Sequence, residues 1–322
     1  MNIPTLHDVY QARATISPYI DRTPLTYSAA LSEALEAEVY LKHEEHLPLG
    51  AFKSRGGINL LAGMSEDERA RGVITASSGN HGQSIASACR MFGVQALIGL
   101  PMGANPNKVA SMEALGAQLI FHGANFDEAR EHCERLAQEE GYRYVHPVNE
   151  PALIAGVATA SLEIIEEMPD VEVMLLPIGG GSGVSGACVV ADAMGPNIQV
   201  VAVQSEAAPA AYLSWQQGQL VAAPMQTWVE GTATAIGYEL PQQIIRHRLH
   251  DFVLVSDDDI RRAVAMLVEK AHTLAEGAGA TALAGAVRHP ELVRGKKISI
   301  TISGSNITLA QLRDCINLYL ND

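Results

Sequence analysis

The stretch Leu47-Pro48-Leu49-Gly50-Ala51-Phe52-Lys53-Ser54-Arg55-Gly56-Gly57 places one lysine between glycines, at a turn from a predicted strand into a predicted helix. Small residues at such a turn let a planar ligand approach the backbone, and Lys53 then directs its amine at that ligand. Most lysines are solvated surface charges, so a catalytic role for Lys53 needs support from the rest of the chain.

Two further glycine-rich turns supply that support. Ser77–Gln83 follows the apolar run Gly72–Ala76 and opens a helical pattern over Ser84–Phe92, whereas Gly179–Gly183 follows the apolar run Val173–Ile178 and also precedes a helix. A helix N-terminus after a strand presents free backbone N–H groups, which favour an anion. Either turn could also be a tight turn without a ligand, and neither has the spacing of a dinucleotide fingerprint or a nucleotide-hydrolase phosphate loop.

The second turn suits a phosphate, held by backbone amides and by the Ser182 hydroxyl. The first turn suits a smaller anion such as a carboxylate. A lysine combined with two anion sites of different size predicts a phosphorylated aldehyde cofactor and a carboxylate substrate.

Five segments, in order along nearly all of the chain, resemble motifs of the fold-type II pyridoxal-phosphate enzymes, in the threonine dehydratase and serine racemase branch. The segments are Gly50–Gly56, Ser77–Gln83, His146–Pro147 followed by Pro151 and Ile154–Gly156, Gly179–Gly183, and Ser303–Asn306. The resemblance implies a tryptophan synthase β-like α/β fold with two open, twisted, mostly parallel sheets and covering helices. It also implies a small domain, residues 71–149, inserted into a large cofactor-binding domain, residues 1–70 and 150–322, with the cofactor in the cleft between them.

Strand and helix patterns alternate along the chain, as such a fold requires. Amphipathic helices are predicted over Phe126–Glu140 and Asp257–Leu274, the latter with an acidic first turn at Asp257–Asp259. The predicted strands are Glu38–Lys42, Val73–Ala76, Ala96–Leu100, Gln118–Phe121, Val173–Ile178, Gln199–Val203, Phe252–Val255 and Ile298–Ile302.

The resemblance also assigns roles in binding pyridoxal 5'-phosphate and an amino-acid substrate. Lys53 would be the Schiff-base lysine and the base that removes the Cα proton, a role that requires a lowered pKa. The cofactor-binding residues would be Phe52, Lys53, Asn80, Gly179, Gly180, Gly181, Ser182, Gly183, Gly231, Glu276 and Ser303. The substrate would meet Ser77, Ser78, Gly79, Asn80, His81 and Arg130.

Several of these residues have ordinary structural readings as well. Asn80 could simply cap the helix that begins there. His81 could be a packed or surface histidine, and Glu276 a surface glutamate. Arg130 matches a carboxylate-binding arginine of racemase-like members only if the alignment has a one-residue gap, and a solvated helix arginine is the simpler reading.

The predicted reaction is β-elimination from a hydroxy-amino acid such as L-threonine or L-serine, which gives a 2-keto acid and ammonia. Ser303, opposite the pyridine nitrogen, would not stabilise a pyridinium as a carboxylate does, and this favours prompt loss of a β-substituent. A serine or aspartate-type racemase remains an alternative function, because Ser78 can act as a second base. A 3-hydroxyaspartate dehydratase also remains an alternative, because the guanidinium of Arg130 can bind a second substrate carboxylate. A catalytically weak cofactor-binding protein and a synthase that adds a thiol are further alternatives.

The sequence departs from the family pattern at four positions. Ala51 replaces a hydroxyl residue before Phe-Lys, Ser182 replaces a fourth glycine, and Ser305 stands where a second glycine is common. Gln204 stands where metal-activated relatives have a glutamate, so a divalent metal ion is not expected there. A monovalent cation held by carbonyl groups stays open.

Bulk properties set further limits on the function. The 322 residues are long enough for two domains, and 48% hydrophobic against 18% charged residues indicates a compact enzyme. A net charge of −14 argues against nucleic-acid binding. The four cysteines have no paired spacing, which predicts reduced, buried thiols, and no metal motif is visible. We expect a cytoplasmic homodimer or homotetramer without a membrane segment, the oligomeric state being implied by the resemblance alone.

Overall fold

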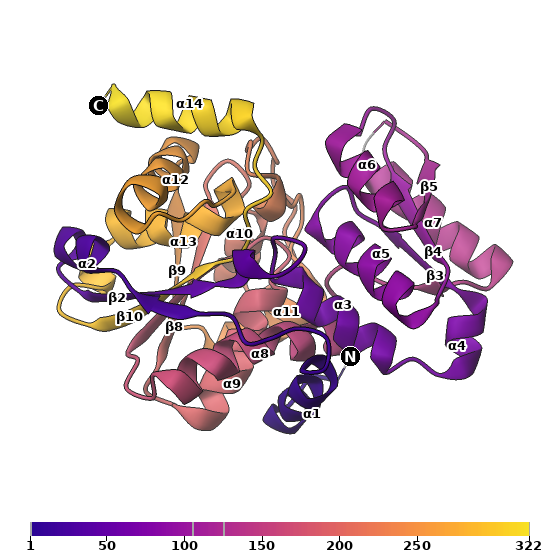
Figure 1. Cartoon of the computed structure of the whole chain (residues 1–322), viewed down its shortest axis with the longest axis horizontal. Coiled ribbons are helices and arrows are strands. Elements are labelled where there is room, and N and C mark those ends of the chain that lie inside the picture. Colours follow the sequence, from indigo (N-terminus) through magenta and orange to yellow (C-terminus); the bar gives the residue numbers. More distant parts are fainter. Residues whose placement is uncertain (1, 105, 125, 322) are drawn as a thin grey trace.

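A computed structural model describes residues 2–104, 106–124 and 126–321, which form two separate β-sheets with helices on both faces (Figure 1). The larger sheet has the strand order β1-β2-β10-β7-β8-β9, in which only β1 is antiparallel to its neighbour. Its strands are β1 (Leu25–Tyr27), β2 (Glu38–His43), β7 (Val173–Pro177), β8 (Gln199–Ser205), β9 (Asp251–Val255) and β10 (Lys297–Ile302).

The smaller sheet is fully parallel, with the order β5-β4-β3-β6. Its strands are β3 (Val73–Ala76), β4 (Ala96–Leu100), β5 (Gln118–Phe121) and β6 (Arg143–Tyr144). The expected α/β fold with two mostly parallel sheets is confirmed. All strands of the smaller sheet come from the predicted small domain, residues 71–149, but the division into domains stays a prediction.

Helices connect and cover the strands. The α-helices are α1 (Leu6–Ile16), α2 (Ala29–Leu35), α3 (Lys53–Ala62), α4 (Glu66–Arg71), α5 (Asn80–Phe92), α6 (Pro106–Ala114), α7 (Phe126–Glu140), α8 (Pro151–Glu167), α9 (Ser182–Met194), α10 (Ala210–Gln217), α11 (Glu239–Arg248), α12 (Asp257–Ala271), α13 (Gly277–Arg288) and α14 (Leu309–Leu320). Short 3₁₀ helices are η1 (Glu44–His46), η2 (Glu230–Thr232) and η3 (Pro290–Leu292).

The larger sheet is buried on both faces because helices pack on each side of it, and the side chains along each strand alternate between the two cores. On β7, Val173 and Leu175 pack into the core that includes residues of α12 and α13. Met174 and Leu176 point the other way, into the core that includes residues of α8 and α9. This double burial explains why the strand reads as a continuous apolar run in the sequence.

Helix α3 packs against α5, beside the smaller sheet, and against α8, beside the larger sheet. Glycines let both helices approach it closely. A Cβ atom added at Gly57 would lie 2.3 Å from Ser84 Oγ on α5, and one added at Gly156 of α8 would lie 2.7 Å from the carbonyl oxygen of Arg55. Side chains larger than hydrogen would push these helices apart. The glycines after Lys53 therefore set the packing of the helix that carries it.

Most predicted elements agree with the structure. The bounds of β3, β4, β5 and α7 match, and α12 begins with its predicted acidic turn, capped by Ser256. The helix predicted to reach Leu274 ends at Ala271, because His272 adopts a left-handed conformation with φ 52°. The helical pattern predicted from Ser84 begins earlier, at Asn80. Strands β1 and β6 were missed because three and two residues are too short to show alternation.

All four cysteines are free and buried, as expected. Across the described ranges, no helix is both long and apolar enough to cross a membrane.

Candidate active site

Lys53 is the first residue of α3, and Phe52 before it is the N-cap. The half-buried side chain of Lys53 donates a hydrogen bond from Nζ to Ser182 Oγ over 2.9 Å, and its carbonyl oxygen accepts a hydrogen bond of 2.6 Å from Ser84 Oγ. Burial lowers the pKa of Lys53 to about 8, because desolvation penalises the ammonium form. A useful fraction of this amine is therefore neutral near physiological pH.

The loop from Gly179 to Gly183 links β7 to the N-terminus of α9, with Gly181 as the N-cap at φ 105°. Within the described residues, no hydrogen bond to the N–H groups of Gly179, Gly180 or Gly181 is present. A Cβ atom at Gly180 would lie 2.4 Å from Val148 Cγ2, so glycine is required for the close approach. Unused N–H groups at a helix N-terminus, with the Ser182 hydroxyl beside Lys53, form a site for a phosphate.

The loop from Ser77 to Gly79 connects β3 to α5 in the same way. Gly79 is the N-cap of α5, and its N–H donates to Ser77 Oγ over 3.2 Å. Ser78 is partly exposed between them. The binding of a small anion at the N-terminus of α5 and the role of Ser78 as a second base both stay predictions.

His81 is buried and neutral. Burial, together with the charges of Lys53 and His146, lowers its pKa to about 3. Its Nε2 lies 3.1 Å from the Thr75 hydroxyl, which itself donates to the carbonyl oxygen of Val145. The Thr75 oxygen can therefore only accept a hydrogen bond from His81. This bond occupies the imidazole N–H group of His81. Any contribution of His81 to a carboxylate site comes from its backbone N–H.

A chain of amide hydrogen bonds crosses between the two sheets. Asn80 Nδ2 donates to Glu276 Oε1 over 2.7 Å, and Asn306 Nδ2 donates both to Asn80 Oδ1 (2.8 Å) and to the carbonyl oxygen of Leu49 (3.0 Å). Asn80 is therefore not the helix cap, since Gly79 holds that position and no side-chain cap is formed. The sequence contained Asn306 in the motif Ser303–Asn306, but its bond to Asn80 becomes visible only in the fold.

Glu276 is not a surface residue, since only 9% of it is exposed. Burial raises the pKa of its carboxyl group to about 7, although the Asn80 hydrogen bond opposes that rise. The carboxyl oxygen also lies next to Gly304, where an added Cβ would come within 2.5 Å of it. Glu276 can thus carry a proton near neutral pH.

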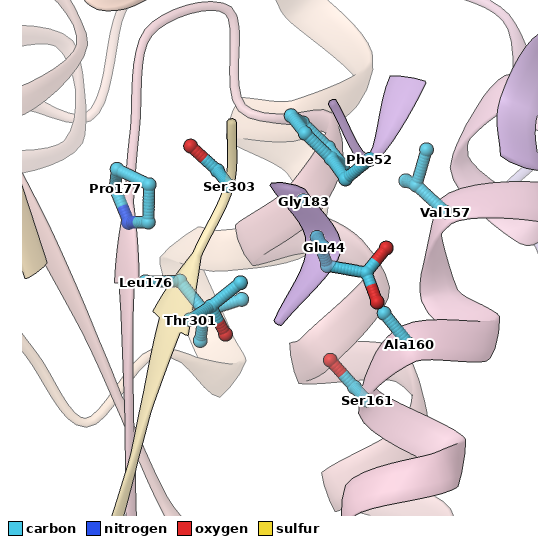
Figure 2. A pocket seen from close by; sticks show the side chains of 10 residues that line it. All are labelled: Glu44, Phe52, Val157, Ala160, Ser161, Leu176, Pro177, Gly183, Thr301 and Ser303. Carbon is cyan, nitrogen blue, oxygen red and sulfur yellow. The ribbon is translucent and has the colours of Figure 1, made fainter. Parts of the chain in front are cut away.

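Ser303 lies directly after β10, and its carbonyl oxygen accepts a 3.0 Å hydrogen bond from the N–H of Phe52. Figure 2 shows the side chains of Phe52 and Ser303 at one small cavity, which Gly183 also lines. The volume of this cavity, about 20 Å³, holds about one water molecule, so it lies beside the site and cannot hold a cofactor. Residues of the lysine turn, the glycine loop and the end of β10 therefore meet at this cavity.

Gly231 lies in η2, next to the glycine loop, and its carbonyl oxygen is 3.0 Å from the position of a Cβ added at Gly179. Beside it, Glu230 forms an ion pair with Lys108 of α6. This pair is a second connection between the helices of the smaller sheet and the larger sheet.

Arg130 lies on α7, and Nη1 donates to Glu134 Oε1 on the same helix over 3.1 Å. Its charge also contributes to lowering the pKa of His146 to about 4, of which burial is the larger cause. Arg130 therefore takes part in protein contacts, and its role toward a substrate stays a prediction.

A buried group of charges beneath α3 was not identified from the sequence. Arg55, 1% exposed, donates to Glu44 (2.7 and 2.9 Å) and to Glu163 (2.6 and 2.9 Å), and Lys42 Nζ adds a 2.6 Å contact to Glu163. The two positive charges of this cluster, on Lys42 and Arg55, compensate the two negative charges of Glu44 and Glu163. The cluster ties β2 and α8 to the first turn of α3, which positions Lys53.

Residues 16–304 match the model of a family described as pyridoxal-phosphate dependent enzymes. The chain belongs to this family. It is 40% identical over 314 residues to the L-threonine ammonia-lyase of Thermotoga maritima, which covers 97% of this chain and 78% of that protein. It is 32% identical to the catabolic L-threonine dehydratase TdcB of Escherichia coli K12, with 95% and 94% covered.

The solved structure of maize serine racemase superposes with a TM-score of 0.91, at 29% identity and with 99% of both chains covered. These similarities confirm the prediction of a fold-type II pyridoxal-phosphate enzyme from the threonine dehydratase and serine racemase branch. They also support β-elimination as the class of reaction.

The residues present fit pyridoxal phosphate. The glycine loop has unused N–H groups for the phosphate, Lys53 supplies an amine that burial keeps partly neutral, and Phe52 and Ser303 lie beside these two groups. When bound, the cofactor supplies an electron sink for the electron pair released at the substrate Cα.

Proposed function

We propose that this pyridoxal-phosphate enzyme is an ammonia-lyase that eliminates water from a hydroxy-amino acid, L-threonine or L-serine, and releases a 2-keto acid and ammonia. The observation that carries the proposal is the position of Lys53, whose half-buried amine contacts Ser182 at the glycine loop and has its pKa lowered to about 8 by desolvation. The threonine ammonia-lyase and dehydratase relatives support the choice of substrate.

The proposed roles combine the geometry of the site with the resemblance to the family. Lys53 would hold the cofactor through its amine and would accept the Cα proton of the substrate. The N-terminus of α5, with Ser77, Gly79 and the backbone of His81, binds the substrate carboxylate. Asn80 and Glu276, which hydrogen-bond to each other, would hold the cofactor together with Ser303, whose hydroxyl would not stabilise a pyridinium as a carboxylate does.

The overall reaction balances. The Cα–H and Cβ–O bonds break, the β-hydroxyl leaves as water after taking up a proton, and the resulting enamine is released. One water then replaces the nitrogen, which leaves as ammonia. The neutral amine of Lys53 supports the proton transfer because a base must be unprotonated at working pH.

The test is turnover of L-serine, D-serine, L-threonine and threo-3-hydroxyaspartate, with the keto acid and the chirality of the remaining amino acid measured in the same samples. Rapid keto acid without inversion, abolished in Lys53→Ala, is expected. The absence of keto acid from a sample with full cofactor absorbance would overturn the proposal, and a thioether formed with added thiol would indicate a synthase.

A racemase is the second candidate, favoured by Ser78 in the loop before α5 and by the similarity to maize serine racemase. Lys53 would take the Cα proton on one face, and the Ser78 hydroxyl would return a proton on the other. Ser78→Ala separates the activities, because it should remove inversion and leave elimination. Turnover of 3-hydroxyaspartate that depends on Arg130 would identify the third candidate, a dicarboxylate dehydratase.

The remaining features are proposed on the sequence alone. They are a small domain of residues 71–149, a homodimer or homotetramer in the cytoplasm, and a monovalent cation near Gln204. Activity measured in potassium and in tetramethylammonium buffers tests the cation, and light scattering of the holoenzyme tests the oligomeric state.

A further inference from the structure

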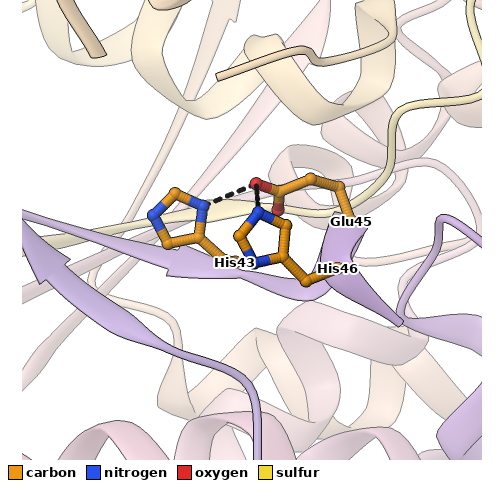
Figure 3. A group of neighbouring side chains, drawn as sticks. All are labelled: His43, Glu45 and His46. Carbon is orange, nitrogen blue, oxygen red and sulfur yellow. Dashed lines mark hydrogen bonds and ion pairs between the residues drawn. The ribbon is translucent and has the colours of Figure 1, made fainter. Parts of the chain in front are cut away.

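At the end of β2, the side chains of His43, Glu45 and His46 converge, although no metal motif is visible in the sequence (Figure 3). Glu45 Oε1 lies 2.5 Å from His43 Nδ1 and 3.6 Å from His46 Nε2. Their ligand atoms all lie within 4.8 Å of one another, and no other such group occurs in the part of the chain that is described. The cluster lies just before the loop that leads to Lys53 and uses none of the residues assigned to the cofactor.

The Glu45 carboxylate lacks sufficient partners. Its side chain is only 4% exposed, and within the described structure Oε2 is buried with no hydrogen bond. A buried carboxylate is costly unless a cation compensates its charge. A hydrogen bond from His43 Nδ1 would satisfy only Oε1 of Glu45. It would leave Oε2 without a partner and would not involve His46.

The orientation of His43 is already fixed. Its Nε2 lies 2.7 Å from the Thr26 hydroxyl on the neighbouring strand β1. A histidine that binds a metal through one nitrogen commonly donates the other N–H to an oxygen acceptor, and this sets the tautomer. Thr26 can serve as that acceptor, which leaves the Nδ1 lone pair directed at Glu45.

We propose that His43 Nδ1, Glu45 and His46 Nε2 bind Zn²⁺ or a similar borderline divalent transition-metal ion. Two imidazoles and a carboxylate are ligands that such ions prefer, with a fourth position left for water. Bond lengths of about 2.0–2.1 Å place ligand atoms about 3.3 Å apart. The 3.6 Å separation suits this geometry, and the 2.5 Å separation requires His43 and Glu45 to move apart by about 1 Å. The two imidazole rings are stacked, with centroids 4.8 Å apart and planes at 18°, so the exposed His46 ring must also rotate toward the ion. The 56% exposed His46 side chain gives the ion access from solvent.

The ion would join the end of β2 to η1. Thr26 connects the same cluster to β1. Binding would therefore stabilise the edge of the larger sheet from which the lysine loop begins. The proposal is independent of the reaction that Lys53 performs.

The test uses metal-free, full-length holoenzyme without a histidine tag, titrated with ZnCl₂ by calorimetry and with CoCl₂ by visible absorption. His46→Ala and Glu45→Gln should each weaken binding at least about tenfold. The control is His289→Ala, because His289 Nδ1 also lies 3.1 Å from a glutamate two residues away, Glu291, but is not part of a three-residue cluster.

One ion per chain, lost in His46→Ala and kept in His289→Ala, is the expected result, together with a rise in melting temperature on adding Zn²⁺ to the unmodified protein and to His289→Ala but not to His46→Ala. Since His46 is exposed, its variant should fold even if Glu45→Gln does not, and circular dichroism checks this. No uptake, or equal uptake by His46→Ala, would show that the cluster holds only a shared proton and would overturn the proposal.

Discussion

The Ser182 hydroxyl, at the N-terminus of α9, accepts a hydrogen bond of 2.9 Å from Lys53 Nζ, at the N-terminus of α3. The resemblance drawn from the sequence places Ser182 where the family pattern has a glycine, and a glycine could not form this contact. It brings a hydroxyl of the loop Gly179–Gly183 within hydrogen-bond distance of the Lys53 amine.

Ser182→Ala should weaken cofactor affinity about three- to tenfold, because one hydrogen bond contributes about 0.5–1.5 kcal/mol. Titration of the apo-protein with pyridoxal phosphate, followed by absorbance, measures this. Ser185→Ala is the control, since Ser185 lies on the same helix with a buried hydroxyl that has no partner in the described structure. Equal affinities for both variants would contradict a role for Ser182.

The rate at which apo-protein captures pyridoxal phosphate should rise with pH around a midpoint near 8. Only the neutral amine of Lys53 reacts, and burial lowers its pKa from 10.5 to about 8. Stopped-flow absorbance at fixed cofactor concentration measures the profile. A midpoint near 10 would show that Lys53 is solvated in the apo-protein.

In the apo-protein, Glu276 should make stability fall as pH rises from 4.5 to 7. Its folded pKa, about 7, lies above the value of 4.5 expected on unfolding, so the folded state holds the extra proton in this window. The loss is at most about 3 kcal/mol at 1.4 kcal/mol per pH unit. Urea unfolding at pH 5 and pH 8 should show the loss in the unmodified protein and in exposed Glu113→Gln, but not in Glu276→Gln.

Glu163→Gln should destabilise the fold by about 3–5 kcal/mol, because it leaves Lys42 and Arg55 with one carboxylate between them in a buried site. Glu166→Gln, on the same helix, is the control. Its ion pairs with Arg13 and Arg22 are partly exposed and are worth about 1 kcal/mol or less. Urea denaturation compares the free energy of unfolding of the two variants. Similar losses would show that the buried cluster contributes no more to stability than the exposed ion pairs.

The sequence by itself determined the family, the alternation of strands and helices, and the positions of the lysine turn and of the two glycine-rich turns that begin helices. These features depend on local patterns: apolar runs for buried strands, glycines where a backbone must approach closely, and helix starts after strands. The bounds of β3, β4, β5 and α7 could be predicted for the same reason.

Only the tertiary structure decided which side chains meet. Asn80 and Glu276 are 196 residues apart and Lys53 and Ser182 are 129 apart, so no local pattern could reveal either bond. The same holds for the lowered pKa of Lys53 and the raised pKa of Glu276, because burial depends on how the two sheets pack. The cluster of His43, Glu45 and His46 is local in sequence, but whether its side chains converge depends on the turn at the end of β2 and on Thr26 of the neighbouring strand.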